Sequence, residues 1–185
     1  MKKYIYSLAI VVVCYFIGES IYEEINRDKT PGKAKRLACQ KEVTTFEKVY
    51  DTEAVIFFQK NIQKVIINLT SDIEKSIYTQ STLLEYISLE ETNEVLKEEF
   101  LKYKNESSND EELDYNIHYY IYENDADDPG KKNKKSKNYA GYILLEIKNN
   151  NGKLIYKIQM DFMKKEKSEI DKTIKCEVKS VMTIK

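Results

Sequence analysis

Residues 139–163 have the sequence YAGYILLEIKNNNGKLIYKIQMDFM, and this stretch decides the fold. Runs of alternating apolar side chains flank Asn151-Gly152, at Ile143, Leu145 and Ile147 before it and at Leu154, Tyr156, Ile158, Met160 and Phe162 after it. A period of two is the pattern of a strand that buries one face. Asn-Gly is a preferred pair for a type I′ turn, whose central residues need positive φ. The stretch therefore predicts a β-hairpin with strands over 139–148 and 153–163.

The same period occurs on both sides of the hairpin. In residues 113–122 the alternating apolar positions are Leu113, Tyr115, Ile117, Tyr119 and Ile121. Near the C-terminus one face of a predicted final strand carries Ile174, Cys176, Val178, Met182 and Ile184. These patterns predict a four-stranded antiparallel sheet with one apolar face, which other elements must cover.

Residues 33–128 contain neither glycine nor proline, so nothing in them forces a turn. Apolar residues recur at steps of three or four from Phe46 to Leu69, which is the stripe of an amphipathic helix. This stripe predicts a helix from just after Cys39 to near Asn68. Capping-box spacings, in which a glutamate follows a serine or threonine by three positions, predict further helix starts at Ser71, Thr82 and Ser88.

Helices followed by consecutive strands predict an α+β domain, with the amphipathic helices packed on one face of the four-stranded antiparallel sheet. With an apolar segment at the N-terminus, this layout is similar to cystatin-like and nuclear-transport-factor-2-like domains, including the bitopic assembly factors of bacterial type IV secretion. The resemblance concerns the layout alone, so it implies a fold and no functional residues.

The first twenty residues carry an export pattern. Lys2 and Lys3 precede the uncharged stretch YIYSLAIVVVCYFIG at 4–18. Such a stretch is typical of a signal peptide, with Gly18-Glu19-Ser20 as the cleavage region, whereas an uncleaved stretch would be a membrane anchor. We therefore predict a signal peptide or membrane anchor at 1–20, a linker at 21–38 and an extracytoplasmic α+β domain at 39–185. The expected location is the periplasm or cell envelope, either secreted or tethered to the membrane through the N-terminal segment.

Two cysteines, Cys39 and Cys176, lie outside this leader. In an oxidising compartment such a pair predicts a disulfide bond. Because Cys176 lies on the predicted inner face of the last strand, the bond would join the start of the helical layer to that strand. Two cysteines and one histidine do not supply the four ligands of a structural zinc site, so no metal is predicted.

Composition and motifs restrict the function classes. The 185 residues have a formal net charge of -1 and are 33% charged, so no overall field attracts nucleic acid and no nucleic-acid partner is predicted. There is no glycine-rich phosphate loop or dinucleotide fingerprint, and no cofactor is expected. The acidic stretch 123–130 resembles a calcium loop, but Pro129 and Ser136 stand where oxygen ligands are required. The lysine-rich stretch 131–137 is expected to be a solvated loop, with contact to a polyanion as the alternative.

One candidate interface emerges from the predicted strands. His118 is the only histidine, and no nucleophile motif accompanies it, so no catalytic residue is assigned. Alternation places His118, Tyr120 and Tyr122 on the outer face of the sheet, together with Tyr142 of the next strand. Aromatic residues with a polar rim are typical of protein or glycan interfaces. Packing beneath a loop or an unrecognised helix is the alternative for these side chains.

The leading hypothesis is a non-catalytic envelope protein that acts through protein–protein interaction, in an accessory, assembly, inhibitor or immunity role. One alternative is a small domain that binds an apolar ligand between the helices and the sheet. Another is a hydrolase that uses paired carboxylates with opposed pKa shifts.

Overall fold

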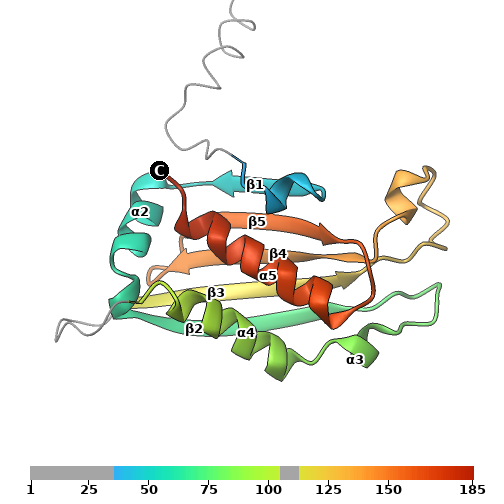
Figure 1. The fold of residues 1–185 in the computed structure, drawn as a ribbon, viewed down its shortest axis with the longest axis horizontal. Helices are drawn as coiled ribbons and strands as arrows, with labels where there is room; N and C mark the ends of the chain where they lie inside the picture. The colour runs from blue at the N-terminus through green and yellow to red at the C-terminus, as the bar shows by residue number, and fades with distance from the viewer. Residues whose placement is uncertain (1–35, 105–112) are drawn as a thin grey trace, which may run out of the picture. The chain divides into compact units, whose positions relative to one another are not determined.

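Five strands form one sheet in the order β1-β5-β4-β3-β2 (Figure 1). In this computed structural model, which describes residues 36–104 and 113–185, the strands are β1 (Thr45–Val49), β2 (Val65–Glu74), β3 (Leu113–Glu123), β4 (Gly141–Asn149) and β5 (Leu154–Phe162). β2 runs parallel to β3, and the other neighbouring strands are antiparallel. The predicted α+β class is confirmed. The predicted four-stranded antiparallel sheet is wrong, because the sheet has five strands and is mixed.

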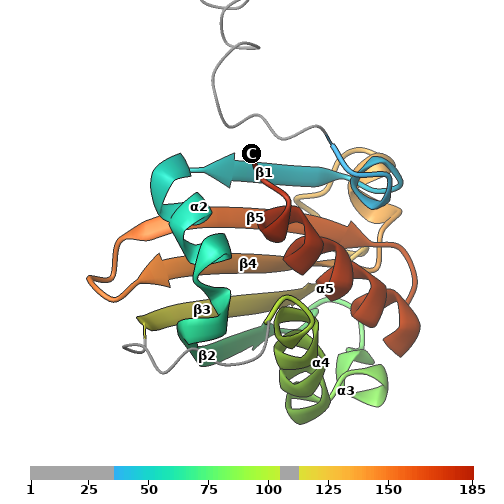
Figure 2. The ribbon, with the colours of Figure 1, turned by 60° about the vertical axis from the view of Figure 1, so that its left-hand side comes forward.

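The helices cover one face of this sheet. The described helical elements are α2 (Thr52–Lys60), α3 (Leu83–Tyr86), α4 (Leu89–Leu101) and α5 (Lys167–Met182), with 3₁₀ turns η1 (Cys39–Lys41), η2 (Ile62–Lys64) and η3 (Lys135–Lys137). α2, α4 and α5 lie across the same side of the strands (Figure 2). We call the opposite side, which carries His118, Tyr120 and Tyr122 of β3, the open face, because no described α-helix lies on it.

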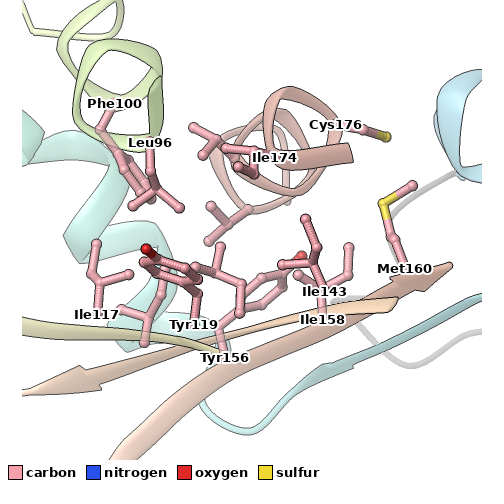
Figure 3. Packing of buried hydrophobic residues seen from close by; sticks show 14 of the residues in the cluster. Leu96, Phe100, Ile117, Tyr119, Ile143, Tyr156, Ile158, Met160, Ile174 and Cys176 are labelled. Atoms are coloured by element: carbon pink, nitrogen blue, oxygen red, sulfur yellow. The ribbon is translucent and has the colours of Figure 1, made fainter. Parts of the chain in front are cut away.

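The core fills the space between the helices and the sheet (Figure 3). Tyr119 of β3 and Tyr156 of β5 are fully buried there, and they point toward the layer that carries Leu96 and Ile174. Apart from Leu154, the residues predicted to face inward on β3, β4 and β5 do face this core. The pairing of β4 with β5 shifts register between Ile147 and Lys148, and Ile155 is buried there in place of Leu154. The alternation in these strands is therefore a reliable signal, because one face of each strand must be apolar.

β4 and β5 form the predicted hairpin, but the turn between them differs from the expected one. Gly152, with φ of 74°, is the one residue with positive φ in the described parts of the chain. The Gly152 N–H donates to the Asn149 carbonyl oxygen over 2.9 Å, and the Asn149 N–H donates to the Lys153 carbonyl oxygen over 3.0 Å. The connection is thus a three-residue loop closed by a left-handed glycine, and not a type I′ turn.

The single helix predicted from just after Cys39 to near Asn68 is wrong. The chain there forms β1, α2, η2 and β2 in succession. Polar side chains make the breaks in place of glycine or proline: Asp51 caps α2, and its Oδ1 accepts the Ala54 N–H over 3.0 Å. The expected stripe is not one buried face, since Phe58 is fully buried whereas Phe46 and Phe57 are 64% and 52% exposed.

The predicted capping boxes have mixed outcomes. Ser71 lies inside β2, so the helix start predicted there is wrong. Thr82 and Ser88 are the N-cap residues of α3 and α4, as predicted. The Ser88 hydroxyl accepts the Glu91 N–H over 3.4 Å, which is the capping contact that this spacing predicts.

The predicted final strand is a helix, α5. The buried side of α5 follows steps of three and four through Ile170, Thr173, Ile174, Glu177, Val178 and Val181. Cys176 is buried at the side of this helix, where it points away from Ile174 (Figure 3).

The predicted disulfide is present. The sulfur atoms of Cys39 and Cys176 are bonded, and the two Cα atoms lie 6.1 Å apart. Because Cys39 begins η1 and Cys176 lies in α5, the bond joins the segment before an edge strand to the C-terminal helix. The expected link between a helix start and a final strand is corrected accordingly.

The predicted leader at 1–20 lies outside the described residues, as do all but the last residues of the predicted linker at 21–38. Residues Ala34–Ile184 form one compact unit. In 36–104 and 113–185, no helix combines the length and the apolar character that a membrane span requires.

Candidate functional site

The candidate interface residues His118, Tyr120, Tyr122 and Tyr142 share the open face. Tyr122 pairs across the sheet with Tyr142, and their rings stack with centroids 4.8 Å apart. The Tyr120 centroid lies 6.0 Å from that of Tyr142. We call Tyr120, Tyr122 and Tyr142 the tyrosine patch, because the structure brings these three rings into contact.

Charged side chains border the tyrosine patch. The Tyr120 hydroxyl donates to the carboxylate of Glu74, the last residue of β2. Lys131 lies over the patch from the connection between β3 and β4, with Nζ 5.3 Å from the Tyr122 ring centroid and 5.9 Å from that of Tyr139. Burial and the nearby Glu74 carboxylate raise the pKa of Tyr120, so its hydroxyl stays a neutral donor. The patch is therefore partly covered by a loop and partly open.

His118 lies beside the patch and contacts the edge strand. Its Nδ1 is 3.0 Å from the Thr70 hydroxyl, and its Nε2 is 3.6 Å from an Asp72 carboxylate oxygen. This order of hydroxyl, imidazole and carboxylate resembles a hydrolytic triad. However, the distance to Asp72 exceeds that of a hydrogen bond, and Thr70 and Asp72 are exposed to water. We therefore interpret the contact as a cross-strand polar pair between β2 and β3.

A second set of residues lies at one end of the sheet. Because β2 and β3 are parallel, the segments that follow them leave the sheet at the same end (Figure 1). Glu123, the last residue of β3, is fully buried and accepts hydrogen bonds from the loop that follows β2. Its donors in residues 76–82 are the Ser76 N–H and hydroxyl, the Ser81 hydroxyl and the Thr82 N–H.

Asp125 holds the middle of the same loop. Its carboxylate accepts the N–H groups of Ile77, Tyr78 and Thr79 over 2.7, 2.5 and 3.2 Å, and the Thr79 hydroxyl over 2.6 Å. Asp125 is 5% exposed. Two buried carboxylates therefore satisfy the backbone of residues 76–82, which we call the held loop.

The electrostatics of both carboxylates depend on these hydrogen bonds. Burial by itself would raise the pKa of Glu123, but the bonds from Ser81 and Lys165 and from the loop backbone outweigh it and lower the pKa to about 2. Burial opposes ionisation of Asp125 in the same way, and the bonds from Thr79, Tyr78 and Ile77 lower its pKa to about 2. Lys165 Nζ lies 3.0 Å from Glu123 and brings a third segment to this end of the sheet.

The held loop displays two large apolar side chains. Ile77 is 83% exposed and Tyr78 is 61% exposed, although the backbone N–H groups of both are bound to Asp125. Exposed Leu84 of α3 and Met163, directly after β5, belong to the segments joined here by Glu123 and Lys165. This end of the molecule therefore combines apolar exposure with an ordered backbone.

Neither buried carboxylate was predicted as part of this site. The sequence places Glu123 and Asp125 in a stretch that resembles a calcium loop, and the structure shows both serving as acceptors for the held loop instead. Among the described residues, no three histidine, cysteine or acidic side chains gather as a metal site. The only sequence signal is a run of small polar residues around Ile77 and Tyr78 in SIYTQST at 76–82, and it does not identify the acceptors.

Comparisons of the chain with protein-family models, curated proteins and solved structures gave no significant match.

Proposed function

We propose that this chain is a protein-binding domain of the cell envelope, which contacts its partner through Ile77 and Tyr78 of the held loop. The observation that carries the proposal is the bonding of the held loop, in which Glu123 and Asp125 each accept four hydrogen bonds from residues 76–82. Exposure of an isoleucine side chain to water does not stabilise the fold. A loop whose backbone is fixed while it displays Ile77 and Tyr78 therefore indicates a binding role.

The order of the held loop reduces the cost of binding. Fixing one residue of a flexible loop costs about 1–2 kcal/mol in conformational entropy, and a partner that binds a mobile loop must supply that free energy. Here the buried carboxylates have already ordered the backbone. Tyrosine is also enriched among the residues that contribute most to protein interfaces.

The tyrosine patch extends this surface onto the open face. Glu74 accepts the Tyr120 hydroxyl and lies two residues before Ser76, the first residue of the held loop to bond Glu123. The patch and the held loop are therefore continuous through the end of β2. An envelope location is supported by the N-terminal export pattern and is consistent with the disulfide bond.

The buried acids at this site favour binding over carboxylate-dependent hydrolysis. A pair of carboxylates that works as acid and base needs opposed pKa shifts, whereas the pKa values of Glu123 and Asp125 are both lowered. The space between helices and sheet is filled by buried side chains such as Tyr119 and Tyr156, which favours a packed core over a cup for an apolar ligand.

Site-specific photo-crosslinking in intact cells of the source tests the proposal. A photoreactive phenylalanine analogue replaces Tyr78 in one variant and Phe57 in the control, since Phe57 is a similarly exposed aromatic residue on α2. We expect one adduct of defined mass at position 78 and none of that mass at position 57. Absence of any adduct at position 78, or the same adduct at both positions, would contradict the proposal.

A further inference from the structure

β2 is an edge strand of ten residues, and its second edge has no partner strand in the described parts of the chain. The other edge strand, β1, has five residues and carries Glu47 and Lys48. Residues 65–71 of β2 have the sequence VIINLTS, with no charge, proline or glycine. Natural edge strands are usually shortened, bulged or charged to prevent pairing, and this part of β2 has none of these devices.

The two sides of β2 have different chemistry. Ile67, Leu69 and Ile73 point to the helical side and are only half-buried, so apolar surface at this edge is incompletely covered. α4 contacts β2 on that side. Lys104 Nζ donates to the Val65 carbonyl oxygen over 2.9 Å. This bond occupies the first residue of the strand, so the stretch that is left for pairing runs from Ile66 to Glu74.

The open face is acidic at this edge. Asp72 and Glu74 of β2 and Asp114 of β3 are exposed, and neither strand contains a lysine or an arginine. The lysines that the other strands carry on the open face lie across the sheet, with Lys148 on β4, Lys157 on β5 and Lys48 on β1. Lys131 reaches the same face at the tyrosine patch, from the connection between β3 and β4. On the open face, a strand added beside β2 would lie next to Ile66, Asn68, Thr70, Asp72 and Glu74, and the charged members of this row are both carboxylates.

We propose that β2 binds an extended segment of a protein partner by strand addition, and that this segment alternates apolar residues with lysine or arginine. Its backbone pairs with the free edge of β2, its apolar side chains cover Ile67, Leu69 and Ile73, and its basic side chains face Asp72 and Glu74. The backbone edge of β2 is not part of the surface assigned to Ile77, Tyr78 and the tyrosine patch, which it meets at Glu74, so the inference goes beyond the proposed function.

Binding of synthetic peptides to the purified full-length chain tests this inference. The probe is a labelled eight-residue peptide of alternating valine and lysine, and the controls are the valine–glutamate analogue and a peptide with four valines followed by four lysines. We expect the alternating basic peptide to bind best, to weaken as salt is added and to slow amide exchange in residues 66–74. Asp72→Lys should lower its affinity about fivefold, whereas Asp127→Lys, the same change of charge on an exposed loop residue, should not.

The outcomes separate the two surfaces. Equal binding of the three peptides, protection outside β2 or no binding at roughly millimolar peptide would overturn strand addition. The Ile77→Ser/Tyr78→Ser variant should bind the probe as the unchanged chain does, so a failure of the held loop as an interface leaves this test intact. Circular dichroism of each variant shows that a loss of binding does not come from unfolding.

Discussion

At the scale of single residues, Glu177 is the most unusual side chain of the fold. It is fully buried in α5, and among the described residues neither carboxyl oxygen has a partner at full hydrogen-bond geometry, although the Met160 backbone lies close enough to oppose the effect of burial in part. Burial raises the pKa of this carboxyl well above its ordinary value of 4.5, because water no longer solvates the charge. Glu177 also interrupts the apolar stripe of α5, so the alternation of Ile174, Cys176 and Val178 looks like a strand in the sequence.

The unchanged chain should lose folding stability as pH rises because Glu177 must ionise in the core, and Glu177→Gln should not show this loss. A raised folded-state pKa means that the stability of the protonated form is fully present below about 4.5 and is lost toward neutral pH. The loss is about 1.4 kcal/mol per pH unit until the folded pKa is reached. Urea unfolding of both proteins from pH 5 to 8 should show the unchanged chain losing stability relative to the variant. If the free energies of unfolding of the two proteins change in parallel with pH, a protonated Glu177 in the folded state is contradicted.

At the scale of elements, the held loop depends on β3 more than on its own sequence. Glu123 and Asp125 lie more than forty residues beyond the groups they bind, and the parallel pairing of β2 with β3 brings them together. The ordering of the loop is therefore a tertiary property.

Glu123→Gln should loosen the held loop at neutral pH. It removes a charged acceptor from several donors and should cost about 2 kcal/mol of stability, and Asp125→Asn should act in the same direction. Amide exchange of residues 76–82 measures the effect, and Glu166→Gln, an exposed change near Lys165, is the control. Protection of these amides that is the same in Glu123→Gln as in the control would contradict this account.

The same loop should open in acid. The pKa of each carboxylate is lowered to about 2, so the stability that both contribute is present above their ordinary values of 4.5 and 3.8 and is lost as pH falls toward 2. Exchange rates corrected for the intrinsic effect of pH should therefore rise in residues 76–82 between pH 5 and 2. The rise should be smaller in the variant with both acids amidated, and an equal rise in both proteins would exclude the carboxylates as the cause.

The secondary structure of some elements could be predicted from the sequence and that of others could not, for physical reasons. The 113–123 strand and the 141–162 hairpin were predictable, because their apolar alternation is long and two of these strands flank an Asn-Gly turn. The alternation of Ile174, Cys176 and Val178 misled, because these residues belong to a helix. Residues 45–74 were not predictable, because Asp51 and Asn61 make the turns there without glycine or proline, and Val65, Ile67 and Leu69 fit a period of two as well as a helical stripe. The tyrosine patch followed from the alternation, whereas the held loop required contacts between segments far apart in the chain.

At the scale of the whole molecule, the disulfide holds the N-terminal edge of the sheet to the helical layer. Cys39 precedes β1, which among the described strands pairs only with β5, and Cys176 lies in α5. The bond spans a sequence separation of 137 residues, so it restricts most of the unfolded chain.

Cys39→Ser/Cys176→Ser should lower the stability of the domain strongly. The chain-entropy relation gives about 5 kcal/mol for a loop of this length, which corresponds to a fall in Tm on the order of 10 °C. Thermal unfolding of the variant should match that of the reduced, unchanged chain. An unchanged Tm in both would show that the bond adds no stability.

The most direct test of the central claim is competition for the crosslinked adduct formed at position 78, measured in opened cells so that added protein can reach the partner. Purified unchanged chain should suppress the adduct, and Ile77→Ser/Tyr78→Ser should not. Glu123→Gln/Asp125→Asn keeps both apolar side chains but loses the order of the loop. We therefore expect it to suppress the adduct only at a concentration about tenfold or more above that of the unchanged chain. Equal competition by Glu123→Gln/Asp125→Asn and the unchanged chain would contradict the claim that buried carboxylates prepare this loop for binding.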